Sequence, residues 1–548
     1  MFFYSFDESF HPNKKANNLN KSHKSNRLMT SQPTPGTPAE APQNKQLSID
    51  DIAAFCKRKG LIYPSSEIYG GMAGFFDYGP MGVELKNNIK AAWWHSFVQT
   101  RDDIVGIDGS IITNPKVWKA SGHVDNFVDI LVEDTKTGER FRADHFVEEK
   151  LKIPTDGMSI DQLHELIVTN KLKSPKGNDL TKPIKFNLMF QTYVGPKVSE
   201  ENIAYMRAET AQHMFVQFKN VFEAARGRLP LGIAQIGRSF RNEISPRNFV
   251  FRCREFEQME IEYFVNPDKY ELDCPYIEEV MDIPVTLYTQ DCQTNKTDAF
   301  TTTIRAALAA KQIGTQWHAY FIGLTQRFFV NLGIAPGHLR LRQHLKEELS
   351  HYSKDTWDLE YKFPFGFKEL WGIADRGQYD LTQHSTHSGK DLSVFDEESK
   401  KRITPRVIEP ALGLDRTFIV FLLEGLSYDA ARENNVLKLH PKLSPVKFGV
   451  FPLMKKDGLS EIARDLYLQL REDSACQFDE GGSVGKRYAR MDEIGTPYCL
   501  TIDYQTKEDG SVTIRDRDST QQKRIAIVEL IQIASRLANG KMAFSEIE

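Results

Sequence analysis

The chain has 548 residues, which favours several domains over one. Its composition is ordinary for a soluble globular protein, because 40% of the residues are hydrophobic and 26% are charged. The formal net charge of -4 excludes a global positive field, so a nucleic-acid partner would have to be bound by local basic patches. No apolar run reaches the length that is needed to span a bilayer.

The N-terminal segment lacks the pattern of a secretory signal, because Asp7 and Glu8 directly follow the opening MFFYSF. Residues 1–46 are predicted to be a disordered tail, since they are rich in Asn, Lys, Ser, Pro and Gln and cannot bury enough surface to offset chain entropy. The six cysteines form no CxxC pair, which argues against a zinc knuckle and against a disulfide framework. A reducing compartment, the cytoplasm, is therefore expected.

Two helices are predicted at the start of the folded region. The segment LSIDDIAAFCKRKG (47–60) has an amphipathic pattern with Ser48 as the cap and Gly60 as the stop. Pro80 favours the first turn of a second helix. An apolar stripe follows at helical spacing, formed by Met81, Leu85, Ile89, Ala92, Trp93 and Phe97. This pattern is typical of a core helix and equally of an interface helix.

The middle of the chain is predicted to be rich in strands, with candidates at 187–196 and 232–244. From about 266 to 355 the pattern becomes charged and helical, as in LRLRQHLKEELSHY, and a largely helical insertion is expected. Residues 441–548 alternate strand and helix, which predicts a separate α/β domain. Within it, PYCLTIDY (497–504) and SVTIRDRD (511–518) predict strands joined by a Glu-Asp-Gly turn.

The segment FRNEISPRNFVFRCREFEQMEIEYF (240–264) has the clearest chemical pattern. It predicts an antiparallel hairpin with strands at 240–243 and 251–264 and a loop at 244–250. Because side chains alternate along a strand, one face of the second strand carries Arg252, Arg254, Phe256, Gln258, Glu260 and Glu262. Arginine suits phosphate, an aromatic ring stacks on a base, and a carboxylate holds an amine or ammonium. A solvated strand with cross-strand ion pairs explains the pattern equally well.

Several motifs resemble those of class II aminoacyl-tRNA synthetases. FRNE…REF is similar to their motif 2, GLDR (413–416) after EP (409–410) to motif 3, and the helix that opens with Gly79 and Pro80 to the dimer-forming motif 1. More narrowly, from about residue 48 to about 540, the chain resembles the single-chain, homodimeric glycyl-tRNA synthetases. The matching segments, in the family's order, are SEIYGG, DYGPMGVELKNNIK, VWKASGH, RADH, NLMFQTYVGP, AETAQ, RNEISP, REFEQMEIEYF, ELWGIADR, YDL, VGKRYARMDEIGTPY and TIRDRD.

The resemblance implies an α+β fold, with a class II catalytic domain on an antiparallel sheet at 47–440 and an α/β anticodon-binding domain at 441–548. It also implies a homodimeric ligase that uses ATP to activate glycine as an adenylate, releases pyrophosphate, and transfers glycine to tRNA(Gly). Two alternatives stay open. One is a catalytically silent, synthetase-like tRNA-binding subunit, and the other is a class II synthetase for a different small amino acid.

The resemblance implies a nucleotide site in which Arg241 and Arg416 are the catalytic residues. Arg241 would hold the α-phosphate, and the adenine would lie between Phe256 and Arg416. Glu243 would meet the adenine amino group. The implied ATP-binding set is Arg241, Asn242, Glu243, Phe251, Arg252, Arg254, Glu255, Phe256, Glu369, Leu370, Gly413, Asp415 and Arg416.

A metal ion is expected together with the nucleotide. Mg²⁺ is expected because the triphosphate charge needs neutralising, and the resemblance makes Glu369 and Glu409 candidate contacts. His384 and His387 lack further ligands nearby, so no zinc site is expected.

Glycine is expected to be selected by a narrow pocket, which rejects larger side chains by steric clash. Affinity must then come from the ammonium and carboxylate groups of the substrate. In the family, glutamates surround the ammonium, and Glu209 and Glu260 are the matching positions. The implied glycine-binding set is Arg142, Glu209, Phe256, Gln258, Glu260, Arg376, Glu409, Ala411 and Gly413. For Arg142 and Arg376, structural ion pairing is the alternative.

Three positions depart from the family pattern. Ala208 and His213 stand where the family usually has Pro and Gly, and Ala411 stands where it usually has a serine beside the glycine site. Loss of that hydroxyl keeps the silent-subunit alternative open, whereas the intact phosphate-binding residues argue against it.

A basic cluster in the C-terminal domain is the candidate tRNA contact. Lys486, Arg487 and Arg490 lie near one face of a predicted helix and could contact tRNA phosphates, although a solvated helix face is equally consistent. The neighbouring GGSVGKR is not a phosphate loop, because Glu480 stands at the first Gly position and Arg487 replaces Ser/Thr.

Overall fold

The computed structural model describes residues 47–153, 155, 158–270, 274–350 and 352–548, so the predicted tail at 1–46 lies outside the described residues. The first element, helix α1 (Ile49–Lys59), has the predicted ends. Ser48 Oγ accepts from the Asp51 amide at 3.1 Å, and Asp51 accepts from the Ser48 amide at 3.0 Å. Gly60 ends the helix at φ 69°, a conformation that glycine adopts without strain. Helix α2 (Pro80–Trp94) begins at Pro80, as predicted.

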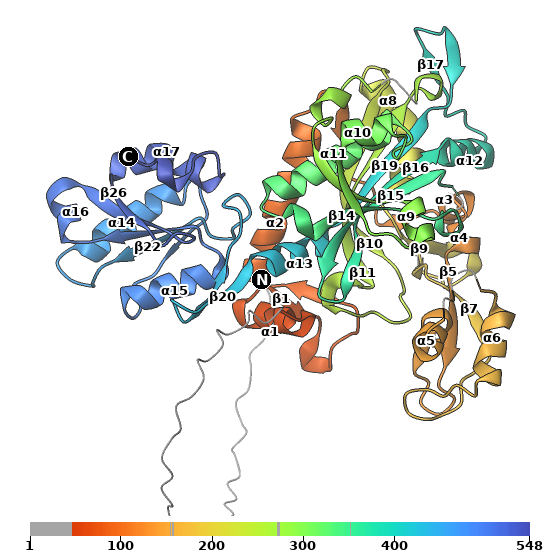
Figure 1. The fold of residues 1–548 in the computed structure, drawn as a ribbon, viewed down its shortest axis with the longest axis horizontal. Helices are drawn as coiled ribbons and strands as arrows, with labels where there is room; N and C mark the ends of the chain where they lie inside the picture. Colours follow the sequence, from red (N-terminus) through yellow and green to blue (C-terminus); the bar gives the residue numbers. More distant parts are fainter. Residues whose placement is uncertain (1–46, 154, 156–157, 271–273, 351) are drawn as a thin grey trace, which may run out of the picture. The chain divides into compact units, whose positions relative to one another are not determined.

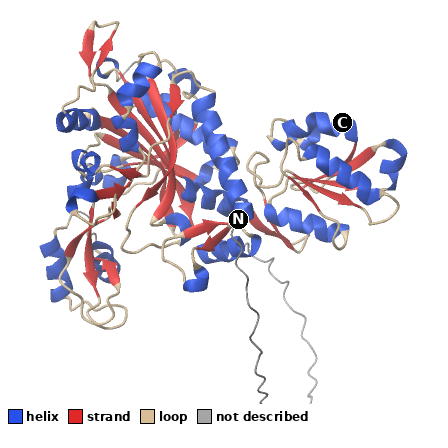
Figure 2. Cartoon of the chain, turned by 180° about the vertical axis from the view of Figure 1, so that it is seen from behind, coloured by secondary structure: helices blue, strands red, loops and turns tan. Residues whose placement is uncertain are grey.

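A mostly antiparallel sheet of nine strands organises the larger part of the fold (Figures 1 and 2). Only the pairs β12/β14 and β10/β3 are parallel within it. In spatial order the strands are β13 (Phe300–Thr303), β12 (Pro284–Tyr288), β14 (Leu339–Gln343), β15 (Asp355–Phe363), β16 (Gly366–Gly377), β19 (Arg406–Gly413), β11 (Glu255–Val265), β10 (Leu231–Phe240) and β3 (Ile104–Gly106).

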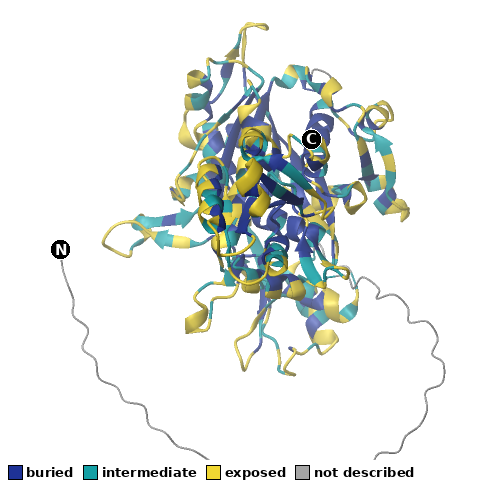
Figure 3. Ribbon diagram, turned by 90° about the vertical axis from the view of Figure 1, so that its left-hand side faces the viewer, coloured by how far each residue is buried: buried dark blue, intermediate teal, exposed yellow. Residues whose placement is uncertain are grey.

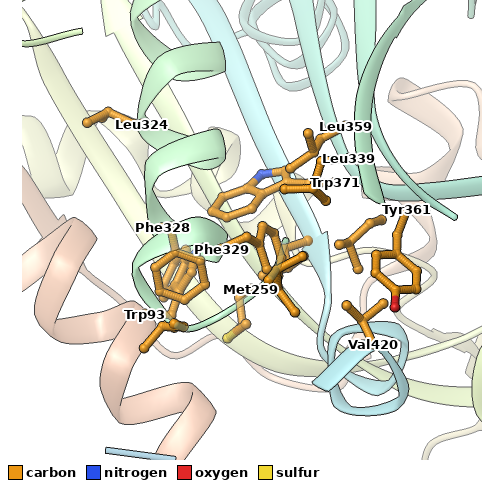
Figure 4. Packing of buried hydrophobic residues seen from close by; sticks show 14 of the residues in the cluster. Trp93, Met259, Leu324, Phe328, Phe329, Leu339, Leu359, Tyr361, Trp371 and Val420 are labelled. Carbon is orange, nitrogen blue, oxygen red and sulfur yellow. The ribbon is translucent and has the colours of Figure 1, made fainter. Parts of the chain in front are cut away.

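One face of this sheet packs against helices α2, α11 (Gln316–Asn331) and α13 (Leu414–Gly425). Alternate residues of β11, such as Met259 and Ile261, point into this core. Figure 4 shows Trp93 of α2 and Phe328 of α11 gathered near Trp371 of β16. The rings of Phe328 and Trp371 meet edge to face at a centroid distance of 6.0 Å. Figure 3 shows that the central strands are buried, whereas the outer loops are exposed.

The opposite face of the sheet carries α7 (Ala211–Val216), α8 (Phe218–Ala224) and α12 (Tyr379–Ser388), which pack a second apolar cluster around one end of the strands. Phe218 lies against Phe264 of β11, with ring centroids 4.3 Å apart. The rest of this face is polar, and it is here that the predicted site residues gather.

Smaller sheets complete this part of the chain. The strands β5 (Val128–Glu133), β6 (Arg140–Arg142) and β7 (Ile184–Asn187) pair in the order β6-β5-β7, and α5 (Ala143–Leu151) and α6 (Ile160–Thr169) pack on them around Val132, Val147 and Leu163 (Figure 1). The other sheets are β4 (Ile112–Thr113), β9 (Ile203–Met206) and β8 (Gln191–Tyr193); β1 (Ile62–Pro64) with β2 (Phe76–Tyr78); β17 (Val394–Asp396) with β18 (Lys401–Ile403); and β20 (Leu426–Asp429) with β21 (Asn434–Leu437).

The C-terminal residues form an α/β unit with a hydrophobic core of its own. Its five strands pair in the order β23-β22-β24-β25-β26, parallel among the first three and antiparallel among the last three. They are β22 (Phe448–Pro452), β23 (Cys476–Phe478), β24 (Tyr498–Ile502), β25 (Ser511–Asp516) and β26 (Gln522–Ala526). The helices are α14 (Leu459–Leu470), α15 (Val484–Ile494), α16 (Tyr504–Asp509) and α17 (Ile527–Ala538).

The prediction of a largely helical insertion at about 266–355 is confirmed for its helices but wrong in leaving out three strands. This segment contains α11 and the short helices α9 (Gln290–Asn295) and α10 (Ile304–Ala309), but it also supplies β12, β13 and β14 to the central sheet. In β14 the sequence LRLRQ alternates, with Leu339 and Leu341 buried between more exposed arginines. That spacing is the period of a strand and not of a charged helix.

Two further expectations need correction. The strands of the 240–264 hairpin pair from Leu231–Phe264 to Phe240–Glu255, so the residues from Arg241 to Arg254 form a long connection that includes a 3-10 turn at Phe249–Phe251. Asn248 and Phe249 there have φ values of 57° and 56°, and the Arg254 amide donates to Gly74 O instead of a strand partner. The connection from β24 to β25 is helix α16 and not a simple turn.

None of the described helices is both long enough and apolar enough to cross a membrane. All six cysteines are free thiols, and Cys476 is the one that is not fully buried.

Candidate active site

A cavity of about 190 Å³ lies on the polar face of the central sheet. Its floor follows the pairing of β11 with β19, in which Gln258 lies opposite Gly413 and Glu260 opposite Ala411. Because side chains alternate along a strand, Met259, between Gln258 and Glu260, points into the core on the other side. The strand pairing therefore brings two segments about 150 residues apart in the sequence to one surface.

Most of the predicted site residues line this one cavity. Those that do are Glu209, Arg241, Glu243, Phe251, Arg252, Phe256, Gln258, Glu260, Glu369, Glu409, Ala411, Gly413, Asp415 and Arg416. The sequence analysis predicted no role for four further lining residues, Val250, Cys253, Tyr352 and Leu412.

Two arginines lie on aromatic rings at one end of the cavity. The Arg241 guanidinium carbon lies 5.2 Å from the centre of the Phe256 ring, and Arg241 Nε donates to Ala208 O at 3.1 Å. The Arg416 guanidinium lies 4.5 Å from the Phe251 ring and pairs with Glu369 at 2.9 Å. Phe256 and Arg416 thus face the same cavity. In the expected adenine site both would contact the purine, but here Arg241 lies on Phe256 and Arg416 lies on Phe251.

Glu243 is held by Arg252 at the same end. Arg252 Nη2 lies 2.6 Å from Glu243 Oε2, and Nε donates to the same oxygen at 2.8 Å. Two donors of one guanidinium therefore meet the same oxygen of the carboxylate that was expected to meet adenine. A ligand group that uses Glu243 Oε2 would have to replace that contact.

Several predicted residues stand outside the cavity lining. Arg254 donates to the backbone oxygens of Glu243 and Ala73, so it braces the connecting segment. Glu255 pairs with Arg238. Arg142, on β6, lies 3.3 Å from Asp129 and pairs with Asp144. Asn242 and Leu370 also do not line the cavity, and Leu370 lies in the main core.

Asp415 has a structural role at the cavity wall. Its Oδ2 accepts from the Glu257 amide at 2.7 Å, and its Oδ1 accepts from the Tyr78 hydroxyl and lies 3.5 Å from Lys86 Nζ. These contacts tie the start of α13 to the start of β11 and to α2. They fix the position of Arg416, which is the next residue in the chain.

The other end of the cavity is acidic and buried. Glu209, Glu260 and Glu409 line it and are exposed by only 6%, 1% and 7%. Burial, together with the nearby carboxylates of Glu409 and Glu209, raises the pKa of Glu260 to about 8. Burial likewise raises the pKa of Glu409 despite the opposing effect of Arg376. Burial acts against ionisation of Glu209 too, but His123, Arg376 and Gln212 outweigh it and hold its pKa below the usual range.

Arg376 is the cation beneath these carboxylates. It is 1% exposed, and it forms a two-pronged contact with Asp380 through Nε at 2.8 Å and Nη2 at 2.9 Å. Its third donor, Nη1, reaches Glu409 at 2.8 Å, and its guanidinium lies 3.9 Å from the Tyr352 ring. Arg376 does not line the cavity, so it positions Glu409 from behind.

The predicted magnesium contacts differ in how well they suit a metal. Among the described residues, no group of three or more His, Cys, Asp and Glu side chains comes together as a metal-binding cluster. Glu369 suits a shared site, because it lines the cavity at its arginine end and its side chain is 49% exposed. Glu409 suits it poorly, because Arg376 already occupies its carboxylate at the acidic end.

The departures from the family pattern fall in different places. Ala208 packs in a cluster with Trp118 and Met189. His213 lies against Gly109, where an added Cβ would come within 2.7 Å of its ring, and its Nε2 is 3.4 Å from Thr113 Oγ1. Neither residue lines the cavity, whereas Ala411 does. Only Ala411 therefore changes the chemistry of the lining.

The basic cluster predicted to bind tRNA lies on α15. Arg487 is only 3% exposed, and its guanidinium donates to the backbone oxygens of Pro452, Glu480 and Gly482. Its role is therefore structural, and the prediction of a phosphate contact is wrong for this residue. Lys486 is exposed, and Arg490 is exposed but paired with Asp479.

Solved structures with the same architecture define the class. A prolyl-tRNA synthetase from Cryptosporidium parvum, complexed with halofuginone and AMPPNP, superposes with a TM-score of 0.55 at 14% identity, covering 91% of this chain and 77% of that one. Residues 447–537 match the family described as "Anticodon binding domain". The fold, with an antiparallel sheet that carries the cavity and a C-terminal anticodon-binding domain, is that of a class II aminoacyl-tRNA synthetase.

Sequence comparison narrows this class to one family. The glycine–tRNA ligase of Thermobifida fusca is 44% identical over 513 residues, covering 90% of this chain and 99% of its own. That of Geobacillus thermodenitrificans is 44% identical over 493 residues, covering 88% and 96%. The chain belongs to the glycine–tRNA ligase family.

The structure also reveals a layer of residues for which the sequence analysis proposed no role. His123, Gln212 and Asp380 contact Glu209 or Arg376 from outside the cavity. All three occur in segments that resemble the family, VWKASGH, AETAQ and YDL. The signal was therefore present, but the contacts depend on folding and cannot be derived from spacing.

Proposed function

We propose that this protein binds ATP and glycine in the cavity described above, forms glycyl-adenylate with release of pyrophosphate, and transfers the glycyl group to tRNA(Gly). The observation that carries this proposal is that the two ends of the cavity differ in chemistry. One end has arginines lying on aromatic rings, and the other has three buried carboxylates. A nucleotide and an amino acid need these two chemistries side by side.

The nucleotide is assigned to the arginine end. Arg241 is close enough to Phe256 for both to meet a bound nucleotide, with the guanidinium on the α-phosphate and the ring on the purine. Arg416 closes the purine from the other side once it leaves Phe251. Mg²⁺ bound to the triphosphate would be held in part by Glu369, and it would neutralise phosphate charge.

Glycine is assigned to the acidic end. Its ammonium would be received by Glu209 and Glu260, and Gln258 lies beside Glu260 with its amide donating at 2.5 Å. The substrate carboxylate then points toward Arg241 and the α-phosphorus. Burial raises the pKa of Glu260 and of Glu409, and a substrate ammonium would stabilise the ionised form of these carboxylates.

The chemistry requires no nucleophilic side chain. The glycine carboxylate oxygen attacks the α-phosphorus, the bond to pyrophosphate breaks, and the negative charge of the transition state meets Arg241. Rate enhancement comes from holding the two substrates in line and from fixed positive charge. The 3′-terminal tRNA sugar hydroxyl then displaces AMP from the carbonyl carbon.

The remaining features of the proposal concern the whole molecule. We assign residues 47–440 to catalysis and residues 441–548 to anticodon binding, with cytoplasmic location. A homodimer is supported by exposed apolar side chains in and before α2: Ile68 and Tyr69 are 89% and 87% exposed, and Met72 before the helix and Val83 within it are also exposed. A subunit interface would bury apolar side chains of this kind.

The test is ATP–pyrophosphate exchange measured with each amino acid in turn. The proposal predicts exchange that depends on glycine. Exchange with alanine or serine but not glycine would assign the protein to another amino acid. An absence of exchange with every amino acid, in a sample that still binds tRNA, would identify a silent tRNA-binding subunit.

A further inference from the structure

We infer that His123, a residue outside the cavity lining, is a positioning residue for amino-acid binding, because it holds Glu209 in the orientation that receives the substrate ammonium. This inference rests on the function proposed above. His123 Nε2 lies 3.3 Å from Glu209 Oε2. His123 is 8% exposed and Glu209 is 6% exposed, so the contact is shielded from water.

The surroundings of His123 fix which ring nitrogen faces Glu209. The imidazole packs edge to face on Trp118, with centroids 5.1 Å apart, and against Phe127 at 5.4 Å. Its Nδ1 meets Ser121 Oγ at 2.8 Å. A carboxylate only accepts hydrogen bonds, so Nε2 must carry the proton toward Glu209. With its faces packed and Nδ1 engaged, the ring has one orientation.

Glu209 is held from its other side by a second set of contacts. Gln212 Nε2 donates to Glu209 Oε1 at 2.9 Å and to Asp380 Oδ1 at 3.0 Å. The Gln212 amide oxygen meets His384 Nε2 at 2.8 Å. Because both hydrogens of this amide face carboxylates and its oxygen faces a ring nitrogen, the amide has one satisfied orientation.

Glu209 Oε1 accepts from Gln212 at 2.9 Å and Oε2 lies 3.3 Å from His123 Nε2, so each oxygen has one fixed neighbour and keeps further lone-pair capacity toward the cavity. Two anchored oxygens define the plane of the carboxylate. An ammonium carries three donors and gains most when its acceptors already lie in place. Without the donor from His123, a buried carboxylate would either turn or favour its neutral form. Both outcomes weaken ammonium binding and leave the nucleotide end unchanged.

Arg376 does not hold Glu209 through a direct hydrogen bond. Its Nη2 lies 3.7 Å from Glu209 Oε1, which is beyond hydrogen-bond distance, and its closer contacts go to Asp380 and Glu409. Gln212 and His123 are thus the residues that contact Glu209 directly. Of the two, only His123 can donate to Oε2, so its removal leaves that oxygen unanchored.

The experiment compares three variants of the full chain by steady-state pyrophosphate exchange. His123→Phe keeps the packing against Trp118 and Phe127 but removes the donor. His123→Gln restores an amide donor at nearly the position of Nε2. His318→Phe is the matched control, because His318 is also a buried imidazole beside a carboxylate, 3.6 Å from Asp355, but it lies on α11 in the main core.

We expect His123→Phe to raise the KM for glycine about tenfold or more, as loss of a hydrogen bond to a charged group predicts, while the KM for ATP changes less than about twofold. His123→Gln should recover most of the loss, and His318→Phe should leave the KM for glycine unchanged. A folded His123→Phe variant with an unaltered KM for glycine would overturn the inference, and so would equal losses in His123→Phe and His123→Gln. Failure of the wild-type chain to catalyse glycine-dependent exchange would instead reject the proposed function.

Discussion

The two ends of the cavity are built in different ways. At the arginine end the arginines are partly exposed, and they pair with carboxylates of the cavity lining, as Arg252 does with Glu243 and Arg416 with Glu369. At the acidic end the carboxylates are nearly fully buried and are held by residues behind them. The first end must exchange its contacts when a nucleotide binds, whereas the second is already arranged for its ligand.

Because of this difference, substitutions at the two ends should have different effects on the free energy of unfolding. Where the partner is itself exposed, as for Arg416 and Glu369, an arginine at the open end is replaced with little loss of stability, because exposed ion pairs contribute about 0–1 kcal/mol. A charged residue behind the acidic end leaves an unpaired buried partner when it is removed, which costs about 3–5 kcal/mol. Variants at the open end should therefore alter catalysis, and variants behind the acidic end should alter folding and glycine binding together.

The largest expected effect is on catalysis at the open end. Arg241→Ala should reduce glycine-dependent pyrophosphate exchange about a thousandfold, because the developing phosphate charge loses its fixed cation. Unfolding should change little, and tRNA binding should stay within about twofold, since the anticodon-binding domain is untouched. The control is Arg238→Ala, which removes an exposed arginine of β10, the strand that ends directly before Arg241; Arg238 pairs with Glu255. Exchange that persists in Arg241→Ala would show that Arg241 does not contact the α-phosphate.

The next effect is on stability behind the acidic end. Arg376→Met should lower the free energy of unfolding by about 3–5 kcal/mol, because Asp380 and Glu409 lose their buried partner. Arg376→Lys should not recover it, since an ammonium cannot reproduce the two-pronged contact. Urea denaturation measures both, with Arg402→Met as the control for an exposed pair with Asp391. Similar values for Arg376→Met and Arg402→Met would contradict the buried network.

A smaller effect depends on pH. The pKa of Glu260 is raised to about 8 from an ordinary value of 4.5, so the folded state binds this proton more tightly than the unfolded state. The resulting stabilisation is complete below pH 4.5 and is lost as the pH rises through about 8. Between pH 6 and 9 the wild type should therefore lose about 2–3 kcal/mol relative to Glu260→Gln.

The control for this pH effect is Glu278→Gln, because Glu278 is an exposed partner of Arg305. Denaturation curves at several pH values would show the loss in the wild type and in this control, but not in Glu260→Gln. A parallel pH dependence in all three proteins would mean that Glu260 is ionised in the empty site.

The smallest effect concerns the C-terminal domain. Lys486→Ala should weaken tRNA binding a few-fold and reduce its salt dependence by about one ion, with no change in stability. Arg487→Ala should instead destabilise this domain by about 1–3 kcal/mol, because three backbone oxygens lose their donor. Filter binding at several salt concentrations and thermal unfolding separate the two. A stable Arg487→Ala variant with weakened tRNA binding would reverse the assignment.

The site could be predicted from the sequence to the extent that it follows local patterns. The alternation along 255–265 placed Phe256, Gln258 and Glu260 on one face, and the resemblance to class II synthetases added Glu409 and Arg416 through the segments EP and GLDR. All five line one cavity. The helices at α1 and α2 were also predictable, because their caps and Pro80 are local signals.

What could not be predicted depends on long-range contacts. The charge of Arg487 predicted a phosphate contact, but the fold turns its guanidinium to backbone oxygens. His123 and Gln212 reach Glu209 only because α4 (His123–Asn126) and α7 pack behind the cavity. The strand β14 was missed because its arginines masked a period of two. Composition and periodicity describe one segment of the chain, whereas these contacts depend on which other segments pack against it.

The central claim is that one cavity holds the nucleotide at its arginine end and the amino acid at its acidic end. A crystal structure with a non-hydrolysable glycyl-adenylate analogue tests it most directly. The account predicts the purine between Phe256 and Arg416, with Arg416 moved off Phe251, and the ammonium within hydrogen-bond distance of Glu209 and Glu260. An ammonium bound away from these carboxylates, or a purine outside the cavity, would contradict it.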